Sequence, residues 1–235
     1  MERTSGEFSK RALSKYPGQT RWAPIFCKTS EIHAFLIGGK HDVIEGWRRA
    51  GCIGLKSCLR FDLAKDTWEE MPSMQEDRRE ASSCALAGYL YVFCGHKHGR
   101  YNLNSIEKLQ LVDSASEQNQ QVWQLIPTSN LASDFTARKS PVACPLNKTQ
   151  ILIMGGQTDY NSYTNDVFIF DSESDQVKKV AGEAAEKITF WATGNACAAV
   201  NEEKVVALVR GNDSKPYLIK YTMGSRSISL IQSFY

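Results

Sequence analysis

The sequence predicts an all-β protein made of four repeated sheets, and three observations support that prediction. Short apolar runs that end at a glycine recur along the 235 residues. A second β-rich segment follows each run after a loop of variable length, and the repeat has a mean period of about 53 residues. The segments are short, rich in β-branched and aromatic residues, and separated by Gly, Asp and Asn, and none carries the apolar stripe of an amphipathic helix.

The apolar run is the first recognisable strand of each repeat. Two runs end in Gly-Gly, one ends in Cys94-Gly95 and one in Arg210-Gly211. Glycine adopts backbone torsions that are closed to other residues, so we assign this glycine step a structural role. The four runs are AFLIGGK at 34–40, LYVFCGH at 90–96, ILIMGGQ at 151–157 and VVALVRGN at 205–212.

Matching positions identify the next two strands of each repeat. The second segments are SCLRFD at 57–62, SIEKLQ at 105–110, DVFIFD at 166–171 and PYLIKY at 216–221. One position in them is shared by Phe61, Leu109, Phe170 and Tyr221, and a large residue follows in the outer strand at Trp68, Trp123, Val177 and Ile228. We expect that large residue to cover the gap between adjacent twisted sheets. We expect Asp62 and Asp171, at the strand ends, to form turns.

The remaining strand of each repeat precedes the glycine step, and in two repeats it follows an arginine, Arg78 or Arg138. Cysteine marks its register, because four cysteines precede the glycine step by 10 to 13 residues: Cys27, Cys84, Cys144 and Cys197. We interpret them as compact buried residues on the innermost strands. A soft-metal site made of these thiols is the less favoured alternative.

A unit of about 50 residues with four strands and a diglycine resembles the kelch repeat of β-propellers. The best matches run from Phe35 to Arg79 and from Arg138 to Asp171. The resemblance implies a kelch-type β-propeller over 23–235, preceded by an N-terminal extension, 1–22, that could add one stray strand. About four four-stranded blades are recognisable, at about 23–77, 78–128, 138–182 and 190–232.

The number of blades is unusual for this family. Kelch propellers usually close with six blades, which at about 50 residues each would need about 300 residues. Four blades therefore predict a partial or unusually small ring. An open arc exposes two sheet faces, so we expect another chain to complete or cover the propeller.

Charge and composition exclude several classes of protein. The chain has 28 Lys and Arg against 26 Asp and Glu, a net charge of +2, which gives no broad field for nucleic acid or a membrane surface. No apolar run approaches the roughly 20 residues of a membrane span, and the N-terminus lacks a secretory signal. Seven cysteines without a CxxC pair suit reduced thiols. We expect a cytoplasmic protein without nucleic-acid or membrane partners.

The loops after the glycine steps are the expected binding sites, because a rigid propeller presents such loops on one face. The candidate residues are Trp47, Arg48, Arg49, His98, Arg100, Tyr101 and Tyr160. Trp and Arg are the residue types most enriched at binding hot spots. Aromatic bodies with basic tips suit a protein or peptide partner, and an acidic peptide in particular. An ordinary solvated loop surface is the alternative.

Candidates for other chemistry are weak. Cys94, His96 and His98 are the best metal-ligand set, but solvated polar loop residues are the commoner explanation, so we expect no metal and no cofactor. The sequence contains no GxSxG, GxGxxG, HExxH or P-loop motif. It therefore predicts a non-catalytic protein-interaction module. Two alternatives stay open: a small-molecule or metal-binding propeller enzyme, because kelch propellers include copper radical oxidases, and a structural subunit of a larger assembly.

Overall fold

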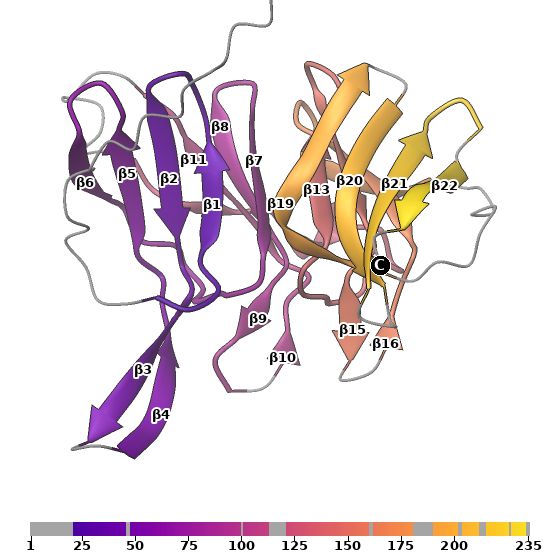
Figure 1. Cartoon of the computed structure of the whole chain (residues 1–235). Helices are drawn as coiled ribbons and strands as arrows, with labels where there is room; N and C mark the ends of the chain where they lie inside the picture. The colour runs from indigo at the N-terminus through magenta and orange to yellow at the C-terminus, as the bar shows by residue number, and fades with distance from the viewer. Residues whose placement is uncertain are drawn as a thin grey trace, which may run out of the picture.

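Four antiparallel sheets of four strands each, here called blades 1 to 4, follow one another along the chain in the computed structural model (Figure 1). The all-β fold with kelch-like blades that the sequence predicts is confirmed. The structure describes residues 21–45, 48–99, 101–112, 121–159, 162–180, 190–201, 204–211, 215–225 and 227–233.

Each blade is built in the order inner strand, glycine-step strand, third strand and outer strand. Blade 1 contains β1 (Ile25–Lys28), β2 (His33–Ile37), β5 (Cys58–Asp62) and β6 (Thr67–Met71). Blade 2 contains β7 (Ser82–Leu86), β8 (Tyr89–Phe93), β11 (Ile106–Gln110) and β12 (Gln124–Leu125). Blade 3 contains β13 (Val142–Pro145), β14 (Gln150–Met154), β17 (Val167–Asp171) and β18 (Gln176–Lys179). Blade 4 contains β19 (Phe190–Asn201), β20 (Lys204–Gly211), β21 (Pro216–Thr222) and β22 (Ser227–Ser233).

A short 3-10 helix, η1 (Thr128–Asn130), lies in the connection between blades 2 and 3. Of the helices in the described residues, none has the length and apolar character needed to cross a membrane. Residues 1–20 of the predicted N-terminal extension, and with them its stray strand, lie outside the described residues. In the described remainder, Trp22 forms an antiparallel bridge with Lys40.

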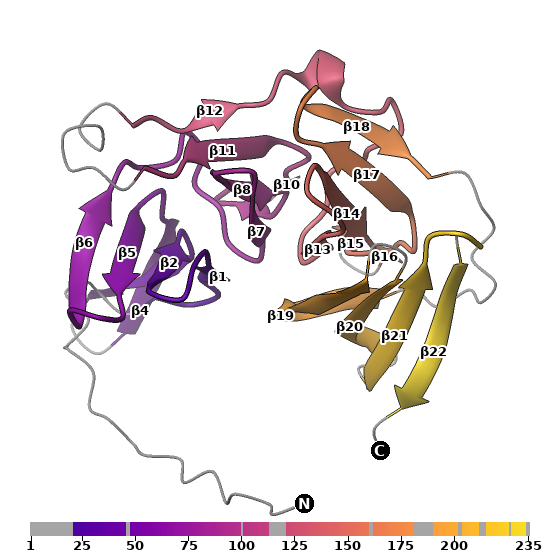
Figure 2. The same cartoon turned by 90° about the horizontal axis from the view of Figure 1, so that it is seen from above.

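The blades are arranged around a common axis, with the inner strands nearest to it (Figure 2). Inner strand β7 contacts β1 and β13, and β19 contacts β13 and also reaches β1. The sheets splay apart away from the axis, and the described residues form an arc without a closed ring.

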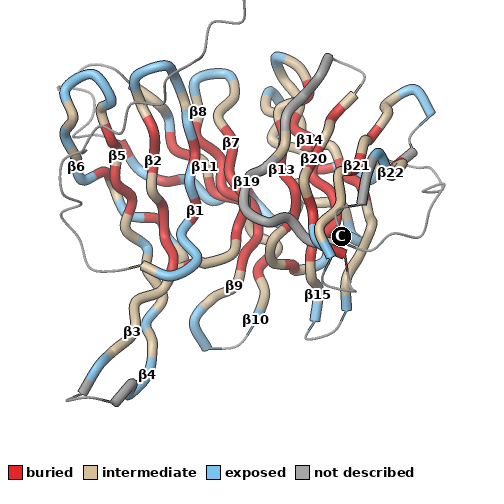
Figure 3. Tube along the Cα trace, in the orientation of Figure 1, coloured by how far each residue is buried: buried red, intermediate tan, exposed pale blue. Residues whose placement is uncertain are grey.

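Apolar clusters hold each blade to the next, and the buried residues are concentrated in the blade strands (Figure 3). In blades 2, 3 and 4, the third and outer strands pack on the preceding blade through Leu109 and Trp123, Phe170 and Val177, and Tyr221 and Ile228, respectively. Trp123 also donates its indole N–H to the carbonyl of Pro72 in the preceding linker, at 2.8 Å. The large outer-strand residue thus covers the gap between sheets, as predicted for blades 2 to 4.

The glycine step needs two different backbone conformations. φ lies between +56° and +66° at its first position and between +95° and +106° at its second. The first range is the left-handed region that other residues enter at a modest cost, whereas the second is nearly restricted to glycine. Cys94, with φ of +60°, can therefore replace the first glycine, and Gly95 cannot be replaced as easily. The first position is Gly38, Cys94 and Gly155, and the second is Gly39, Gly95 and Gly156.

An arginine side chain hydrogen-bonds to the glycine step in three blades. Arg21, Arg78 and Arg138 each donate from Nη1 to the carbonyl of the first residue of the step, at 3.1, 2.8 and 3.2 Å. Arg78 and Arg138 are fully buried. A repeated arginine therefore satisfies a backbone acceptor that the irregular turn leaves outside the sheet.

The two aspartates form turns, as the sequence predicts. Asp62 Oδ1 accepts the backbone N–H groups of Ala64 and Lys65, both at 2.9 Å. Asp171 Oδ1 accepts those of Glu173 and Ser174 at 3.2 and 3.0 Å. The hydrogen bonds from Lys65 and from Ser174 are the largest causes that lower the pKa values of Asp62 and Asp171, respectively.

Candidate binding face

Three β-hairpins project from the same end of blades 1, 2 and 3 and define the candidate binding face (Figure 1). Each begins directly after the glycine step, because the step turns the chain out of the blade. The hairpins are β3 (Lys40–Glu45) with β4 (Arg48–Gly54), β9 (His96–Lys97) with β10 (Tyr101–Asn102), and β15 (Gln157–Asp159) with β16 (Ser162–Tyr163).

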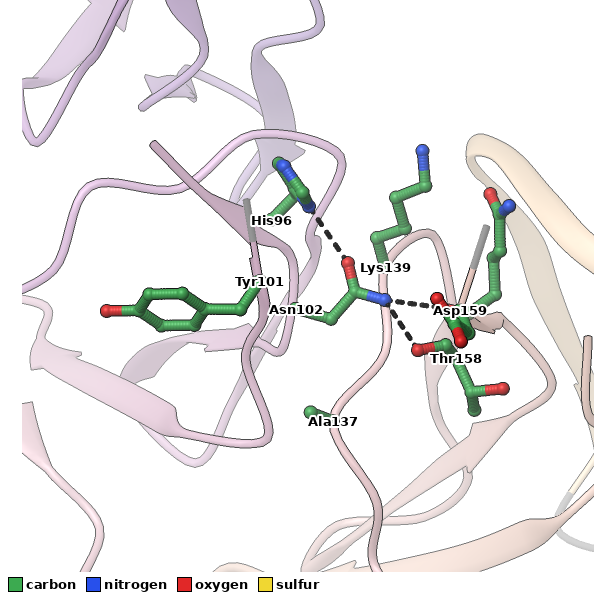
Figure 4. A pocket seen from close by; sticks show the side chains of 8 residues that line it. His96, Tyr101, Asn102, Ala137, Lys139, Thr158 and Asp159 are labelled. Atoms are coloured by element: carbon green, nitrogen blue, oxygen red, sulfur yellow. Dashed lines mark hydrogen bonds between the residues drawn. The ribbon is translucent and has the colours of Figure 1, made fainter. Parts of the chain in front are cut away.

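A pocket of about 410 Å³ lies between the second and third hairpins (Figure 4). It takes residues from both hairpins and from the segment that enters blade 3. The lining residues are His96, Tyr101, Asn102, Ala137, Lys139, Gln157, Thr158 and Asp159. Most of the lining side chains therefore carry hydrogen-bonding groups, and Ala137 and the Tyr101 ring add apolar surface.

Asn102 holds the two hairpins together. Its Nδ2 donates to the carbonyls of Gln157 and Thr158, both at 3.0 Å, and its Oδ1 lies 3.0 Å from Nδ1 of His96. Because an amide oxygen only accepts, Nδ1 of His96 carries the proton in this contact. In the neutral imidazole Nε2 is then an acceptor. One side chain thus fixes the hairpin spacing and sets the hydrogen-bonding character of the histidine.

Acidic residues from the linkers between blades neutralise the basic side chains of this face. Lys139 Nζ lies 2.7 Å from Glu80 Oε2, and Lys97 Nζ lies 3.3 Å from Glu76 Oε1. The hydrogen bond to Glu76 raises the pKa of Lys97. Lys97 also lies 5.8 Å from the ring centroid of Tyr101. The described part of the face carries mixed charge, so binding there depends on local hydrogen bonds and packing more than on a broad field.

The predicted site residues are only partly within the described structure. Trp47, Arg100 and Tyr160 lie outside the described residues, and for Arg48 and Arg49 only the backbone, in β4, is described.

Tyr101 and His98 are described, and both are exposed at the second hairpin. Tyr101 is 54% exposed and lines the pocket. The backbone N–H of His98 donates to Asp77 Oδ2 at 2.8 Å, and its side chain does not line the pocket.

Asn102, Lys139 and Asp159 are pocket residues that the sequence analysis missed. For Lys139 the sequence did hold a signal, namely its position directly after the blade arginine. In three blades the residue at that position forms a bridge with the residue after the second glycine. The bridges are Trp22 with Lys40, Arg79 with His96, and Lys139 with Gln157. Aligning these positions would have placed Lys139 beside the third hairpin.

The three candidate metal ligands do not converge. Cys94 is fully buried in the core between blades 2 and 3, where burial raises the pKa of its thiol to about 11. His96 contacts Asn102, and His98 is exposed at the hairpin turn. Within the described residues, no group of three or more His, Cys, Asp or Glu side chains is arranged to hold a metal ion.

Four blades of one repeated design, each with an inner strand at a shared axis, define the class as a repeat protein with β-propeller architecture. The family model of the kelch motif matches residues 138–182, which include all of blade 3. The chain therefore contains a kelch motif in blade 3, and the other blades repeat its four-stranded design. A comparison with curated proteins found no match.

Proposed function

We propose that this kelch-repeat chain is a non-catalytic protein-interaction module that binds a protein or peptide segment with its hairpin face. The observation that carries the proposal is the pocket between the second and third hairpins, whose spacing Asn102 fixes through hydrogen bonds at 3.0 Å. A preorganised pocket supports binding because less conformational freedom is lost when the ligand arrives.

The chemistry of the pocket defines the segment that would fit. Tyr101 offers a large exposed aromatic surface, which is typical of binding hot spots. The Nε2 atom of His96 can accept a hydrogen bond when the imidazole is neutral. The Lys139 ammonium has three donor hydrogens, so it can donate beyond its pairing with Glu80. We therefore propose a polar peptide segment, and an acidic side chain near Lys139 is the contact that this ammonium favours.

Replacing Tyr101 by alanine is expected to weaken capture of the partner about tenfold, because an aromatic anchor is removed from the pocket. A photo-crosslinking phenylalanine analogue at position 101 identifies the partner in a native extract. The affinities of wild type and Tyr101→Ala for that partner are then measured by calorimetry.

Leu63→Ala is the matched control, since Leu63 is 40% exposed in the turn after β5, at the opposite end of blade 1 from the hairpin. It should bind as wild type does. Equal affinities for Tyr101→Ala and wild type would contradict the proposed site, as would equal crosslinking from positions 101 and 63.

A second candidate function, a structural subunit whose ring another chain completes, is favoured by the face of blade 1 on which the described residues place no neighbouring blade. The strand register places Phe61 and Trp68 on one face of blade 1, with ring centroids 4.7 Å apart. Phe35 lies on the opposite face, which packs toward blade 2. The equivalent residues of blades 2 to 4 pack on a preceding blade. Phe26 on the same face as Trp68 is 56% exposed. The described residues place no further sheet there, so a partner's β-sheet would fit (Figure 2).

A further inference from the structure

The inner strands bring the repeated cysteines together at the axis. Cys27, Cys84 and Cys197 line one pocket of about 350 Å³, in which every blade contributes a strand. The other lining residues are Phe26, Lys28, Ser83, Ala85, Ala143 and Pro145. All seven cysteines of the chain are free thiols. The repeated cysteine position that the sequence revealed is thus a cluster of reduced thiols around a small accessible pocket.

Cys144 and Cys197 are in contact across the boundary between blades 3 and 4. They come from neighbouring inner strands, β13 and β19, and both belong to the apolar cluster that joins these blades. The Cys197 thiol donates to the carbonyl of Ala143, the residue before Cys144, at 3.2 Å. The pKa of Cys197 is raised, first by its hydrogen bond with the Cys144 thiol and then by burial. The two sulfur atoms are therefore neighbours in the folded protein.

We propose that Cys144 and Cys197 are an oxidative modification site, at which a peroxide converts the thiol pair into a disulfide that links blade 3 to blade 4. In the first step the Cys197 thiol gives up its proton and its sulfur attacks one peroxide oxygen, so that the O–O bond breaks; the departing hydroxide takes up that proton as water, and a sulfenic acid remains on Cys197. In the second step the Cys144 sulfur attacks the sulfenic sulfur, the S–O bond breaks, and the hydroxyl leaves as water with the Cys144 proton. The two thiols lose two electrons and two protons to the peroxide.

The exposure of the two thiols decides which one reacts with the peroxide and which one completes the disulfide. Cys197 lines the axial pocket and is partly exposed, so hydrogen peroxide can reach its sulfur. Cys144 is 2% exposed and does not line the pocket, so it is placed to react with Cys197 rather than with the oxidant. Cys27 lines the same pocket but hydrogen-bonds with Ser83, not with a thiol.

Peptide mapping of the oxidised full chain tests the proposal. The reduced protein is incubated with hydrogen peroxide, unfolded in N-ethylmaleimide to block the remaining thiols, and digested with trypsin. Cleavage at lysine places Cys144 alone in peptide 140–148 and Cys197 alone in peptide 188–204. The expected result is a peroxide-dependent crosslink between these peptides, two hydrogens lighter than their sum. The crosslinked wild type should also melt roughly 5 °C higher than the reduced protein.

Three variants sharpen the test. Cys144→Ser and Cys197→Ser should each lose the crosslink and the shift in melting temperature. Cys84→Ser, which removes another thiol of the same pocket, should retain both. The proposal is overturned if both peptides of oxidised wild type carry N-ethylmaleimide, or if Cys197 is found linked to Cys84 or Cys27. The wild-type map is decisive even where a variant fails to fold.

Discussion

Replacing Glu107 by alanine is expected to lower the free energy of unfolding by about 3 kcal/mol, because it leaves a buried guanidinium without its closest charged partner. Arg78 Nη2 lies 2.7 Å from Glu107 Oε1, and both side chains are fully buried. The carboxylate also accepts the backbone N–H groups of Gln75 at 2.7 Å and Glu76 at 3.2 Å. It therefore ties the linker after blade 1 to strand β11 of blade 2. Its loss leaves several polar groups unsatisfied at once.

Urea unfolding of wild type and variants measures this effect. Glu69→Ala is the matched control, since Glu69 makes an ion pair with Arg60 but is 45% exposed, and its loss should cost less than about 1 kcal/mol. Glu107→Gln should fall between the two, because its amide oxygen can still accept from the backbone. Similar losses for Glu107→Ala and Glu69→Ala would show that the buried pair does not hold blades 1 and 2 together.

Replacing Gly95 by alanine is expected to lower the free energy of unfolding by about 2 to 4 kcal/mol, through backbone strain and a steric clash. Its φ is +102°, outside the left-handed region that alanine tolerates. An added Cβ would lie 2.7 Å from Cβ of Ala81 and 2.9 Å from the carbonyl oxygen of Arg79. These are atoms of the segment that enters the inner strand of the same blade, so the blade itself would have to move.

The variant Gly88→Ala separates the effect of backbone strain from that of the steric clash. Gly88 has φ of +77° in the β7–β8 turn, and an added Cβ there meets nothing within 4 Å, so this variant should cost only about 1 kcal/mol of backbone strain. Thermal and urea unfolding of both variants give the comparison. If the two alanines destabilise the protein equally, close packing at the second glycine is not what the kelch step requires.

The blades were predictable because the same position repeats in each of them. Phe61, Leu109, Phe170 and Tyr221 recur at intervals of 48, 61 and 51 residues, each near the end of the third strand, and the structure places the last three in the boundaries between blades. The second and third hairpins were not predicted as strands, because pairs such as His96–Lys97 and Ser162–Tyr163 are too short to show an alternating pattern. The sequence indicated only variable loops there.

The candidate site was predictable only in part, for a similar reason. Tyr101 could be nominated from its residue type and its place after a glycine step. The role of Asn102 depends on two carbonyls 55 and 56 residues away in the next blade, and Lys139 depends on the way its segment meets the third hairpin. Residue type and local pattern carry no information about the contact of Asn102 with the next blade, whereas Lys139 could be placed only by aligning equivalent positions of successive blades.

Recognition by the hairpin face is the central claim, and hydrogen–deuterium exchange of the chain with and without its crosslink-identified partner tests it most directly. Binding should slow amide exchange in the hairpin segments 96–102 and 157–163, which form the pocket. Segments 58–62 and 67–71, the third and outer strands of blade 1, should exchange as in the free protein. Protection confined to those blade 1 strands, with unchanged hairpins, would contradict the account and support completion of the ring by the partner's β-sheet.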